Sequence, residues 1–509
     1  MSVNAAPSRR RASPSNTIAV LLLVSLLQAA APVHAREELG PFGNALIANP
    51  HANPGDKPFG SAMAAGDFND DGIDDLAIAE SFGTRVRVHL GSPWTVSDGL
   101  APIAAVGTTV TTPFHNGELA AGDFNNDGRD ELVLGAAGVN NAAGAAYVLD
   151  RAANGIWTVQ ETIEAAGAYP GAAQPDAQLG HSFAVGDFDN DGFDDLAIGI
   201  IGQTVGGFAN AGAVMVTYGS ATGITSTGAQ LFNRSNDGLT FPPREDDLYG
   251  YALAAGDFDD DGIEELAIGV REATCPNGTS RSGAVVVMVG IDGIGVSSSQ
   301  TRIWRPGTLG IGGDCASTNG FGSELAEGDV DGDGTHDLVI GAPLTGNGFV
   351  HIIYGVFQEG LSAAGNQRFS APSAPGLGTN NSRFGNVLAT GKLRDCQNCI
   401  SKSLVVGAPF TDVNGAVDAG AVWVFYTEDG MPPSAATAKL FVASAVLDAG
   451  VAHTDDRFGS SLAVGDFNDD SNLLDLAIGI PQFEDSGVDE GAVQLLFQSD
   501  LSIFGDGFE

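Results

Sequence analysis

The sequence predicts an all-β protein built from tandem repeats, and three observations support this prediction. The acidic loop Asp187-Phe188-Asp189-Asn190-Asp191-Gly192 lies between two short apolar runs, and loops of this kind or their equivalents begin at residues 67, 123, 187, 257, 329, 392 and 466. Short Val- and Ile-rich runs bounded by Gly-rich turns accompany every copy, which is typical of antiparallel strands. No long stretch has the periodicity of a helix.

Each repeat contains the same parts in the same order. An aromatic-Gly or Leu-Gly pair opens a first strand, the acidic loop follows, and a second strand leaves the loop. The pairs are Phe59-Gly60, Leu179-Gly180, Tyr249-Gly250, Phe321-Gly322, Phe384-Gly385 and Phe458-Gly459, while the second repeat has Phe114 and Gly117 spaced apart. The predicted second strands are Leu76–Ala79, Leu132–Gly135, Leu196–Ile200, Leu266–Val270, Leu338–Pro343, Leu404–Pro409 and Leu476–Pro481. A third strand often begins with Gly-Ala-Val, and a fourth is less regular; Gly212–Gly219 and Trp157–Ile163 are examples.

The acidic loops have the spacing of a calcium site. Counted from Asp187, carboxylates stand at positions 1, 3, 5 and 9, which directs oxygens toward a hard cation that needs 6–8 of them. Gly192 at position 6 allows the sharp turn, and position 7 offers its backbone carbonyl. An EF-hand needs a Glu at position 12, where this loop has Ile198, so the loop joins strands and not helices. One such loop could equally be a solvated turn, but five copies favour calcium.

The predicted calcium ligands, by loop, are Asp67, Asn69, Asp71, Ile73 and Asp75; Asp123, Asn125, Asp127, Arg129 and Glu131; Asp187, Asp189, Asp191, Phe193 and Asp195; Asp257, Asp259, Asp261, Ile263 and Glu265; and Asp329, Asp331, Asp333, Thr335 and Asp337. In the sixth loop Lys392 and Arg394 replace the first two ligands, so we expect no site there. The seventh keeps Asp466, Asn468 and Asp470, but Ser471 replaces the turn glycine and Asp475 falls at position 10. We therefore expect about five Ca²⁺ sites. A sixth site, in the seventh loop, is disfavoured by these changes.

The N-terminus and the charge of the chain predict an exported acidic protein. Arg9–Arg11, the apolar run Ile18–Leu27 and Val33-His34-Ala35 have the pattern of a secretory signal peptide over residues 1–35. No later stretch approaches 18 apolar residues, so we expect no transmembrane segment. The formal net charge of −41 argues against nucleic acid as a partner. It also makes calcium a folding element, because each loop repels itself without metal.

The four cysteines fit an exported protein. Cys275 and Cys315 could bridge neighbouring repeats, and Cys396 and Cys399 could close a small local loop. The second pair could also be redox-active or bind zinc, although no thioredoxin-like pattern and no second C-x-x-C accompany it. We favour structural disulfides, and the sequence leaves the pairing open.

Together, the Phe-Gly pairs, the D-x-[DN]-x-D-G loops and the Gly-Ala-Pro segments at residues 341–343 and 407–409 resemble the FG-GAP repeats of integrin α-subunit propellers. The resemblance covers about residues 40 to 498 and implies a seven-bladed β-propeller whose loops bind Ca²⁺. The expected domains are a signal peptide at 1–35, the propeller at 36–498 and a short tail at 499–509. The chain stops after the third strand of the last blade, so residues Gly43 to Ala48 could supply the missing outer strand and close the ring.

The resemblance implies a binding function more than a catalytic one. The sequence has no G-x-S-x-G, H-E-x-x-H or P-loop motif, and we expect no enzyme activity. We expect a monomeric secreted or cell-surface module that binds an extracellular protein or glycan, as in cell adhesion. A structural surface protein without a specific ligand is the alternative. A hydrolase acting on phospholipid or polysaccharide is a weaker one, which similar repeats in a glycosylphosphatidylinositol-specific phospholipase D suggest.

Overall fold

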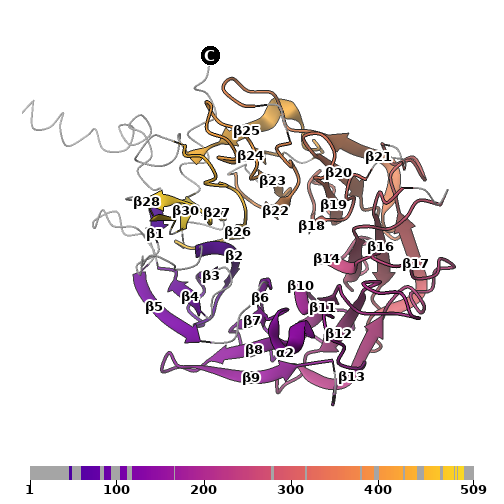
Figure 1. Cartoon of the computed structure of the whole chain (residues 1–509). Helices are drawn as coiled ribbons and strands as arrows, with labels where there is room; N and C mark the ends of the chain where they lie inside the picture. The colour runs from indigo at the N-terminus through magenta and orange to yellow at the C-terminus, as the bar shows by residue number, and fades with distance from the viewer. Residues whose placement is uncertain are drawn as a thin grey trace, which may run out of the picture. The chain divides into compact units, whose positions relative to one another are not determined.

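Seven antiparallel sheets of four strands form the blades of a β-propeller, with the first strands toward the centre of the ring and the fourth strands outside (Figure 1). The computed structural model describes residues 45–48, 59–80, 85–92, 104–111, 117–165, 167–276, 280–313, 315, 318–378, 381–394, 400–427, 430–443, 452–469, 474–485, 488–489 and 491–497. The predicted all-β, seven-bladed propeller is confirmed. The predicted signal peptide, the tail and the Cys396/Cys399 pair lie outside the described residues, so these assignments and the domain boundaries stay predictions.

The strands of each blade follow one another in sequence, except in blade 7. Blades 1 to 3 are β2 Phe59–Gly66, β3 Asp75–Glu80, β4 Arg85–Leu90 and β5 Ala104–Thr111; β6 Leu119–Gly122, β7 Glu131–Gly135, β8 Ala146–Arg151 and β9 Trp157–Ile163; and β10 Leu179–Gly186, β11 Asp195–Ile200, β12 Ala213–Tyr218 and β13 Thr225–Phe232. Blades 4 and 5 are β14 Tyr249–Gly256, β15 Glu265–Val270, β16 Ala284–Val289 and β17 Ser297–Trp304; and β18 Glu324–Gly328, β19 Asp337–Ala342, β20 Phe349–Tyr354 and β21 Ser362–Phe369. Blade 6 is β22 Val387–Gly391, β23 Ser403–Ala408, β24 Ala421–Phe425 and β25 Ala438–Phe441.

Blade 7 combines both ends of the propeller. Its strands are β26 Leu462–Gly465, β27 Asp475–Ile480, β30 Ala492–Leu496 and β1 Ala45–Ala48, with a small ribbon of β28 Glu484–Asp485 and β29 Val488–Asp489. β1 pairs antiparallel with β30, with Ala45 opposite Leu495. The N-terminal segment therefore supplies the outer strand, as the sequence predicts. Within the described residues the helices are α2 Val139–Ala142 and the 3-10 turn η1 Ala435–Thr437, and no helix there is long and apolar enough to cross a membrane.

The middle strands form the core because neighbouring blades cover both of their faces. Every residue of β11 and β15 is buried, whereas the residues of the fourth strand β13 are exposed or half-buried except for Phe232. A second strand such as Leu196–Ile200 consequently reads as an uninterrupted apolar run. Hydrophobic clusters extend from blade to blade; one joins Val216 and Phe232 of blade 3 to Leu266 and Ile268 of blade 4. Blade-to-blade packing thus explains the apolar pattern of the repeats.

The glycine of each aromatic-Gly pair is needed where adjacent blades interlock. Gly250 has φ +86°, and a Cβ there would lie 2.7 Å from the carbonyl oxygen of Ala213 in blade 3. Gly212, at the start of the third strand of blade 3, has φ +81° and forms a parallel bridge with Tyr249. Both positions combine a left-handed backbone with a close backbone approach, so only glycine fits without strain.

Two faces of the propeller can be distinguished by their connections. The acidic loops and the turns between third and fourth strands form the loop face, where the N–H of Gly293 in blade 4 donates to the carbonyl of Asp189 in blade 3 at 2.7 Å. The turns between second and third strands and the links between blades form the link face. Cys275 and Cys315 lie on the link face and form a disulfide with a Cα–Cα distance of 5.7 Å. This is the bridge that the sequence suggests.

Candidate metal centres

The acidic loops connect the first and second strands of the blades, and we number them by blade. Loops 1 to 5 begin at Asp67, Asp123, Asp187, Asp257 and Asp329, and loops 6 and 7 at Lys392 and Asp466. In loop 3, Asp187 accepts the N–H groups of Asp191 at 3.1 Å and Gly192 at 3.0 Å. Asp191 accepts the N–H of Phe193 at 3.1 Å. Positions 1 and 5 therefore hold the loop closed through its own backbone.

Position 9 anchors the loop to the blade. Asp195 is fully buried, and one of its oxygens accepts the N–H of Phe188 at position 2 at 2.9 Å. Its other oxygen accepts the N–H of Gly219 at the end of the third strand, also at 2.9 Å. Positive φ angles at Asn190 (57°) and Gly192 (87°) turn the chain back toward Asp187. The turn glycine that the sequence predicts is thus required by the backbone.

All five predicted loops share this frame. The position-1 carboxylate accepts the N–H groups of positions 5 and 6 at 2.7–3.3 Å in each loop. The position-9 carboxylate accepts the N–H of position 2 at 2.8–3.2 Å in each loop. For position 7, the structure shows that its N–H donates to position 5; the ligand role of its carbonyl stays a prediction.

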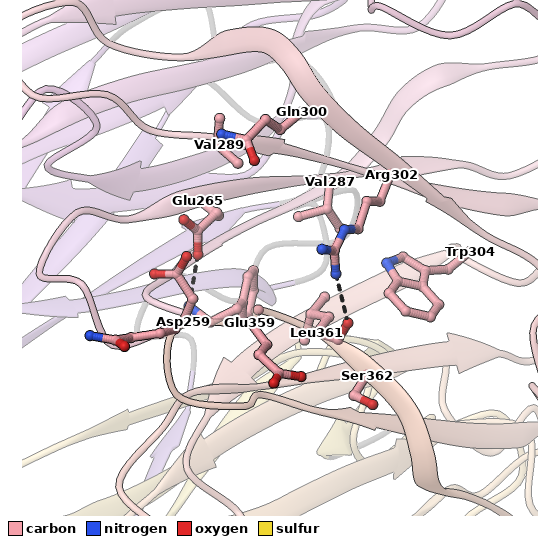
Figure 2. Close-up of a pocket in the computed structure, with 13 residues that line it drawn as sticks. Asp259, Glu265, Val287, Val289, Gln300, Arg302, Trp304, Glu359, Leu361 and Ser362 are labelled. Carbon is pink, nitrogen blue, oxygen red and sulfur yellow. Dashed lines mark hydrogen bonds between the residues drawn. The ribbon is translucent and has the colours of Figure 1, made fainter.

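Three loops bring carboxylates together as a cation site requires. One oxygen from each member of three sets lies within 4.8 Å of the others: Asp187, Asp189 and Asp195; Asp257, Asp259 and Glu265; and Asp329, Asp331 and Asp333. Figure 2 shows Asp259 beside Glu265 in loop 4. Within the described part of the chain, the Oδ1 atoms of Asp189 and Asp259 are buried and have no hydrogen-bond partner. Buried, unpaired oxygens among carboxylates are costly unless a cation binds them.

Burial and mutual repulsion raise the pKa values of the position-9 carboxyls. The pKa is raised to about 7 for Asp75 and to about 8 for Glu131, Asp195, Glu265 and Asp337. Desolvation is the largest cause in all five, and the charges of other acidic residues in the loop add to it. Burial disfavours the charged form of these carboxyls, and a bound divalent cation would favour it.

Loops 1 and 2 differ from the others at position 3, where each has an asparagine. Nδ2 of Asn69 donates to Asp75 at 3.1–3.2 Å, and Nδ2 of Asn125 donates to Glu131. Each amide also has a carbonyl oxygen, which can serve as a ligand if the amide rotates by 180°. The asparagines therefore fit a cation site with one negative charge fewer than loops 3 to 5.

Loop 2 contains an additional ion pair. The guanidinium of Arg129 lies 2.6 Å from Asp127, the position-5 carboxylate, and 3.9 Å from Asp150. Loops 1 and 4 have isoleucine at this position. A cation in loop 2 therefore shares Asp127 with a neighbouring positive charge.

Loops 6 and 7 diverge in different ways. In blade 6, Gly391 pairs with Ser403 at the register where blade 3 pairs Gly186 with Asp195, so the position-9 carboxylate is absent as well. In loop 7 the extra residue does not displace Asp475, which accepts the N–H of Phe467 at 3.2 Å. Oδ1 of Asn468 in loop 7 is buried and unpaired within the described residues. Loop 7 thus keeps part of the frame, and loop 6 does not.

The residue at position 8 joins each loop to the preceding blade, a role that the sequence analysis did not predict. Asp130 of blade 2 accepts the N–H of Asp67 in blade 1 at 2.9 Å, and Asp194 of blade 3 accepts that of Asp123 at 2.9 Å. In return, the position-8 N–H of every blade donates to the position-1 carbonyl of the preceding blade, at 2.7–3.3 Å around the whole ring. In the sequence, this role is indicated by pairs of adjacent acids at positions 8 and 9, such as Asp194-Asp195. Each loop is therefore also a joint between two blades.

The FG-GAP repeat model matches five segments of the chain, at residues 59–95, 116–149, 179–216, 249–288 and 321–353. These segments contain loops 1 to 5 with their flanking strands. Blades 1 to 5 of the chain thus contain FG-GAP repeats. Its blades 6 and 7 keep the fold of the repeat although their loops have diverged.

Part of the chain is similar to phosphatidylinositol-glycan-specific phospholipases D and to integrin alpha subunits. It is 33% identical over 176 residues to the phosphatidylinositol-glycan-specific phospholipase D of Rattus norvegicus, covering 34% of this chain and 20% of the relative. It is 28% identical over 221 residues to integrin alpha pat-2 of Caenorhabditis briggsae (41% and 18%), and 32% identical over 187 residues to integrin alpha-PS2 of Drosophila melanogaster (35% and 12%). The chain thus spans about a fifth or less of the length of these relatives, and it resembles the integrin α propeller.

Proposed function

We propose that this protein is an exported, calcium-stabilised propeller that binds an extracellular protein or glycan, as an adhesion module does. The observation that carries the calcium part is the convergence of carboxylates in loops 3 to 5, with buried oxygens of Asp189 and Asp259 unpaired within the described residues. Oxygen-only donors of this kind suit Ca²⁺ better than zinc or copper. Bound calcium would stabilise the folded loops and would contribute no redox chemistry.

The proposed ligand-binding surface lies on the link face between blades 3 and 4. There the turn after β11 and the link after β13 are joined, since the N–H of Asp246 donates to the carbonyl of Ala209 at 2.9 Å. Asn210 donates to the side chain of Asp246 at the same distance. These two segments expose Phe208 (44%) and Phe241 (36%). Exposed aromatic side chains on a rigid base are common anchors in interfaces.

Phe241 is held in place by buried arginines. The guanidinium of Arg305 lies 4.6 Å from the centre of the Phe241 ring, and that of Arg234 lies 5.9 Å away. Arg234 pairs with the fully buried Asp237 at 3.1 Å. Burial and the nearby positive charge of Arg234 lower the pKa of Arg305 to about 10, which keeps it charged at neutral pH. The phenyl ring is therefore presented on a fixed cationic support.

Other aromatic residues in or near the loops of the link face are less exposed. Tyr169, Trp304 and Phe483 are buried, with 4–9% of their surfaces exposed, so they pack inside the fold. Phe410 is half-buried, with the guanidinium of Arg383 4.2 Å from its ring centre. These three side chains are therefore not exposed anchors. The proposed contact surface is reduced to Phe208 and Phe241, with Phe410 as a secondary element.

We assign no catalytic activity as part of this proposal. The phospholipase relatives are enzymes, but the similarity covers about a fifth of their length and matches the repeats of this chain. No observation in the described residues favours hydrolysis of phospholipid or polysaccharide over binding.

The proposal is tested by capture experiments with the calcium-loaded protein on glycan arrays and extracellular-matrix proteins. Phe208→Ala and Phe241→Ala should weaken capture of any ligand found while leaving calcium content and thermal melting unchanged. Ile294→Ala, an exposed apolar residue on the loop face, is the matched control (63% exposed). Equal capture by the wild type and both phenylalanine variants would exclude the link face as the contact surface. A protein that captures nothing would support the structural alternative.

A further inference from the structure

A cavity of about 460 Å³ opens between blades 4 and 5, beside loop 4 (Figure 2). Asp259 and Glu265 form one side, and strand β17 contributes Gln300, Arg302 and Trp304. The turn at residues 358–362 of blade 5 forms the opposite wall. Two hydrogen bonds to backbone carbonyls connect this turn to blade 4. The N–H of Gln358 donates to the carbonyl of Asp259 at 2.7 Å, and the side chain of Arg302 donates to the carbonyl of Leu361 at 3.2 Å. The cavity is therefore built from two blades that are fixed to each other.

Two polar groups of the lining are unsatisfied. Trp304 is 4% exposed, and its indole nitrogen is buried with no hydrogen-bond partner among the described residues. In Figure 2 this nitrogen lies on the side of the ring toward Arg302. At the other end, Oδ1 of Asp259 is buried and unpaired within the same part of the chain. An unpaired buried donor is unfavourable, so the lining favours an occupant that carries an acceptor for Trp304.

A calcium ion accounts for only one end of the cavity. It would satisfy Asp259, whereas the indole N–H is a donor and cannot bind a cation. If each of the five loop positions supplies one oxygen, at least one of the 6–8 oxygens that Ca²⁺ takes comes from another molecule. A cavity of this volume is in the range of small-ligand sites. The remaining space has amide groups of Gln300 and Gln358 that can both donate and accept.

Charge indicates what class of molecule fits. The four predicted ligand carboxylates of loop 4 would keep two negative charges after binding one Ca²⁺, and the charges of Arg302 and Glu359 cancel each other. A net negative lining disfavours carboxylates and phosphates. A neutral molecule with several hydroxyl groups supplies both acceptors and donors without adding charge.

We propose that this cavity binds a neutral sugar, with a hydroxyl accepting the indole N–H of Trp304 and others facing loop 4. The proposal rests on calcium binding as proposed above and is separate from the link-face surface. A second cavity, of about 310 Å³, lies beside loop 2 and is lined by Asn125, Glu131 and Gln160. Its lining has neither tryptophan nor arginine, so it lacks the unpaired donor.

The test is an NMR titration of the calcium-loaded full chain with D-glucose, D-galactose, D-mannose and N-acetyl-D-glucosamine, and with D-glucuronate as the charged counterpart. At least one neutral sugar should bind saturably, and glucuronate should bind about tenfold more weakly or not at all. Trp304→Phe keeps a ring in the core but removes the N–H, and it should weaken the sugar about fivefold or more. Trp157→Phe makes the same chemical change in β9, outside both cavities, and should leave binding unchanged.

Calcium content is measured on every sample so that the two proposals fail separately. If calcium is bound and no neutral sugar binds, the sugar proposal is wrong while the calcium proposal stands. Equal sugar affinity in Trp304→Phe and the wild type would also overturn it, as would a preference for glucuronate. If no calcium is bound at all, the proposed function itself fails.

Discussion

Loop 3 and loop 6 have similar connections to their neighbours but opposite chemistry. The position-1 carbonyls of Asp187 and Lys392 accept an N–H from the following blade at 3.3 and 3.0 Å, respectively. Position 2 is buried in both, as Phe188 and as Leu393. Loop 3 then buries Asp195, whereas loop 6 has Ser403 at the same register. The joint between blades thus forms with or without the carboxylates.

The comparison separates what shapes the blade from what the cation does. Backbone bonds and a buried apolar residue at position 2 are sufficient for the shape, since blade 6 has both. The ammonium group of Lys402, the residue before Ser403, forms an ion pair with Glu327 of blade 5 at 3.2 Å. Blade 6 therefore has a positively charged side chain next to the position where the other loops have a carboxylate. In loops 1 to 5 the position-9 acid is buried close to other acids of the same loop, and a bound cation would offset the cost of its charge.

Removal of calcium should have the largest effect. One site stabilises the fold by about 2.7 kcal/mol when free calcium is 100 times Kd, so loss of five sites should lower Tm by more than about 10 °C. Differential scanning calorimetry with calcium and with chelator measures this. An unchanged Tm would mean that the acidic loops are stable without metal.

Single-loop variants should divide the blades into two groups. Asp187→Ala or Asp329→Ala removes a charged ligand and the acceptor of two N–H groups, and each should cost about 2–4 kcal/mol and one calcium ion. Lys392→Ala is the matched change at position 1 of loop 6 and should alter stability by less than about 0.5 kcal/mol and the calcium count not at all. Loss of calcium in Lys392→Ala would show that loop 6 is a site after all.

Stability of the calcium-free protein should fall as pH rises. The position-9 carboxyls have pKa values raised to about 7–8 in the fold, above their ordinary values of 3.8 and 4.5. Their protonation therefore favours the folded state fully below pH 4, and this contribution is lost as pH rises toward 8. Melting in metal-free buffer should show the decrease, and the stabilisation by added calcium should grow over the same range. A metal-free Tm that rises with pH would contradict the burial of these groups.

The smallest effect is expected at Arg129. Replacing it by isoleucine, as in loops 1 and 4, removes the ion pair with Asp127 and should strengthen calcium binding to loop 2 about two- to fivefold. Isothermal titration of the variant against the wild type tests this. A weaker site would indicate that the guanidinium orients Asp127 for the cation.

Much of the fold could be predicted because the local sequence of each repeat indicates where its strands lie. The second strands were placed to within one residue; the predicted Leu196–Ile200 is Asp195–Ile200 in the structure. Ring closure by Ala45–Ala48 followed from the missing fourth strand of blade 7. Contacts between repeats were harder, because Asp130 bonds to a residue 63 positions away and Trp304 turns into a cavity formed by two blades. Such contacts depend on how blades pack, which no single repeat encodes.

We expect the carboxylates of loops 1 to 5 to create calcium sites and loop 6 to bind no calcium. Native mass spectrometry of the protein after exchange into calcium buffer tests this most directly. We expect five bound calcium ions, or six if loop 7 also binds. A protein that carries no calcium under these conditions would contradict it.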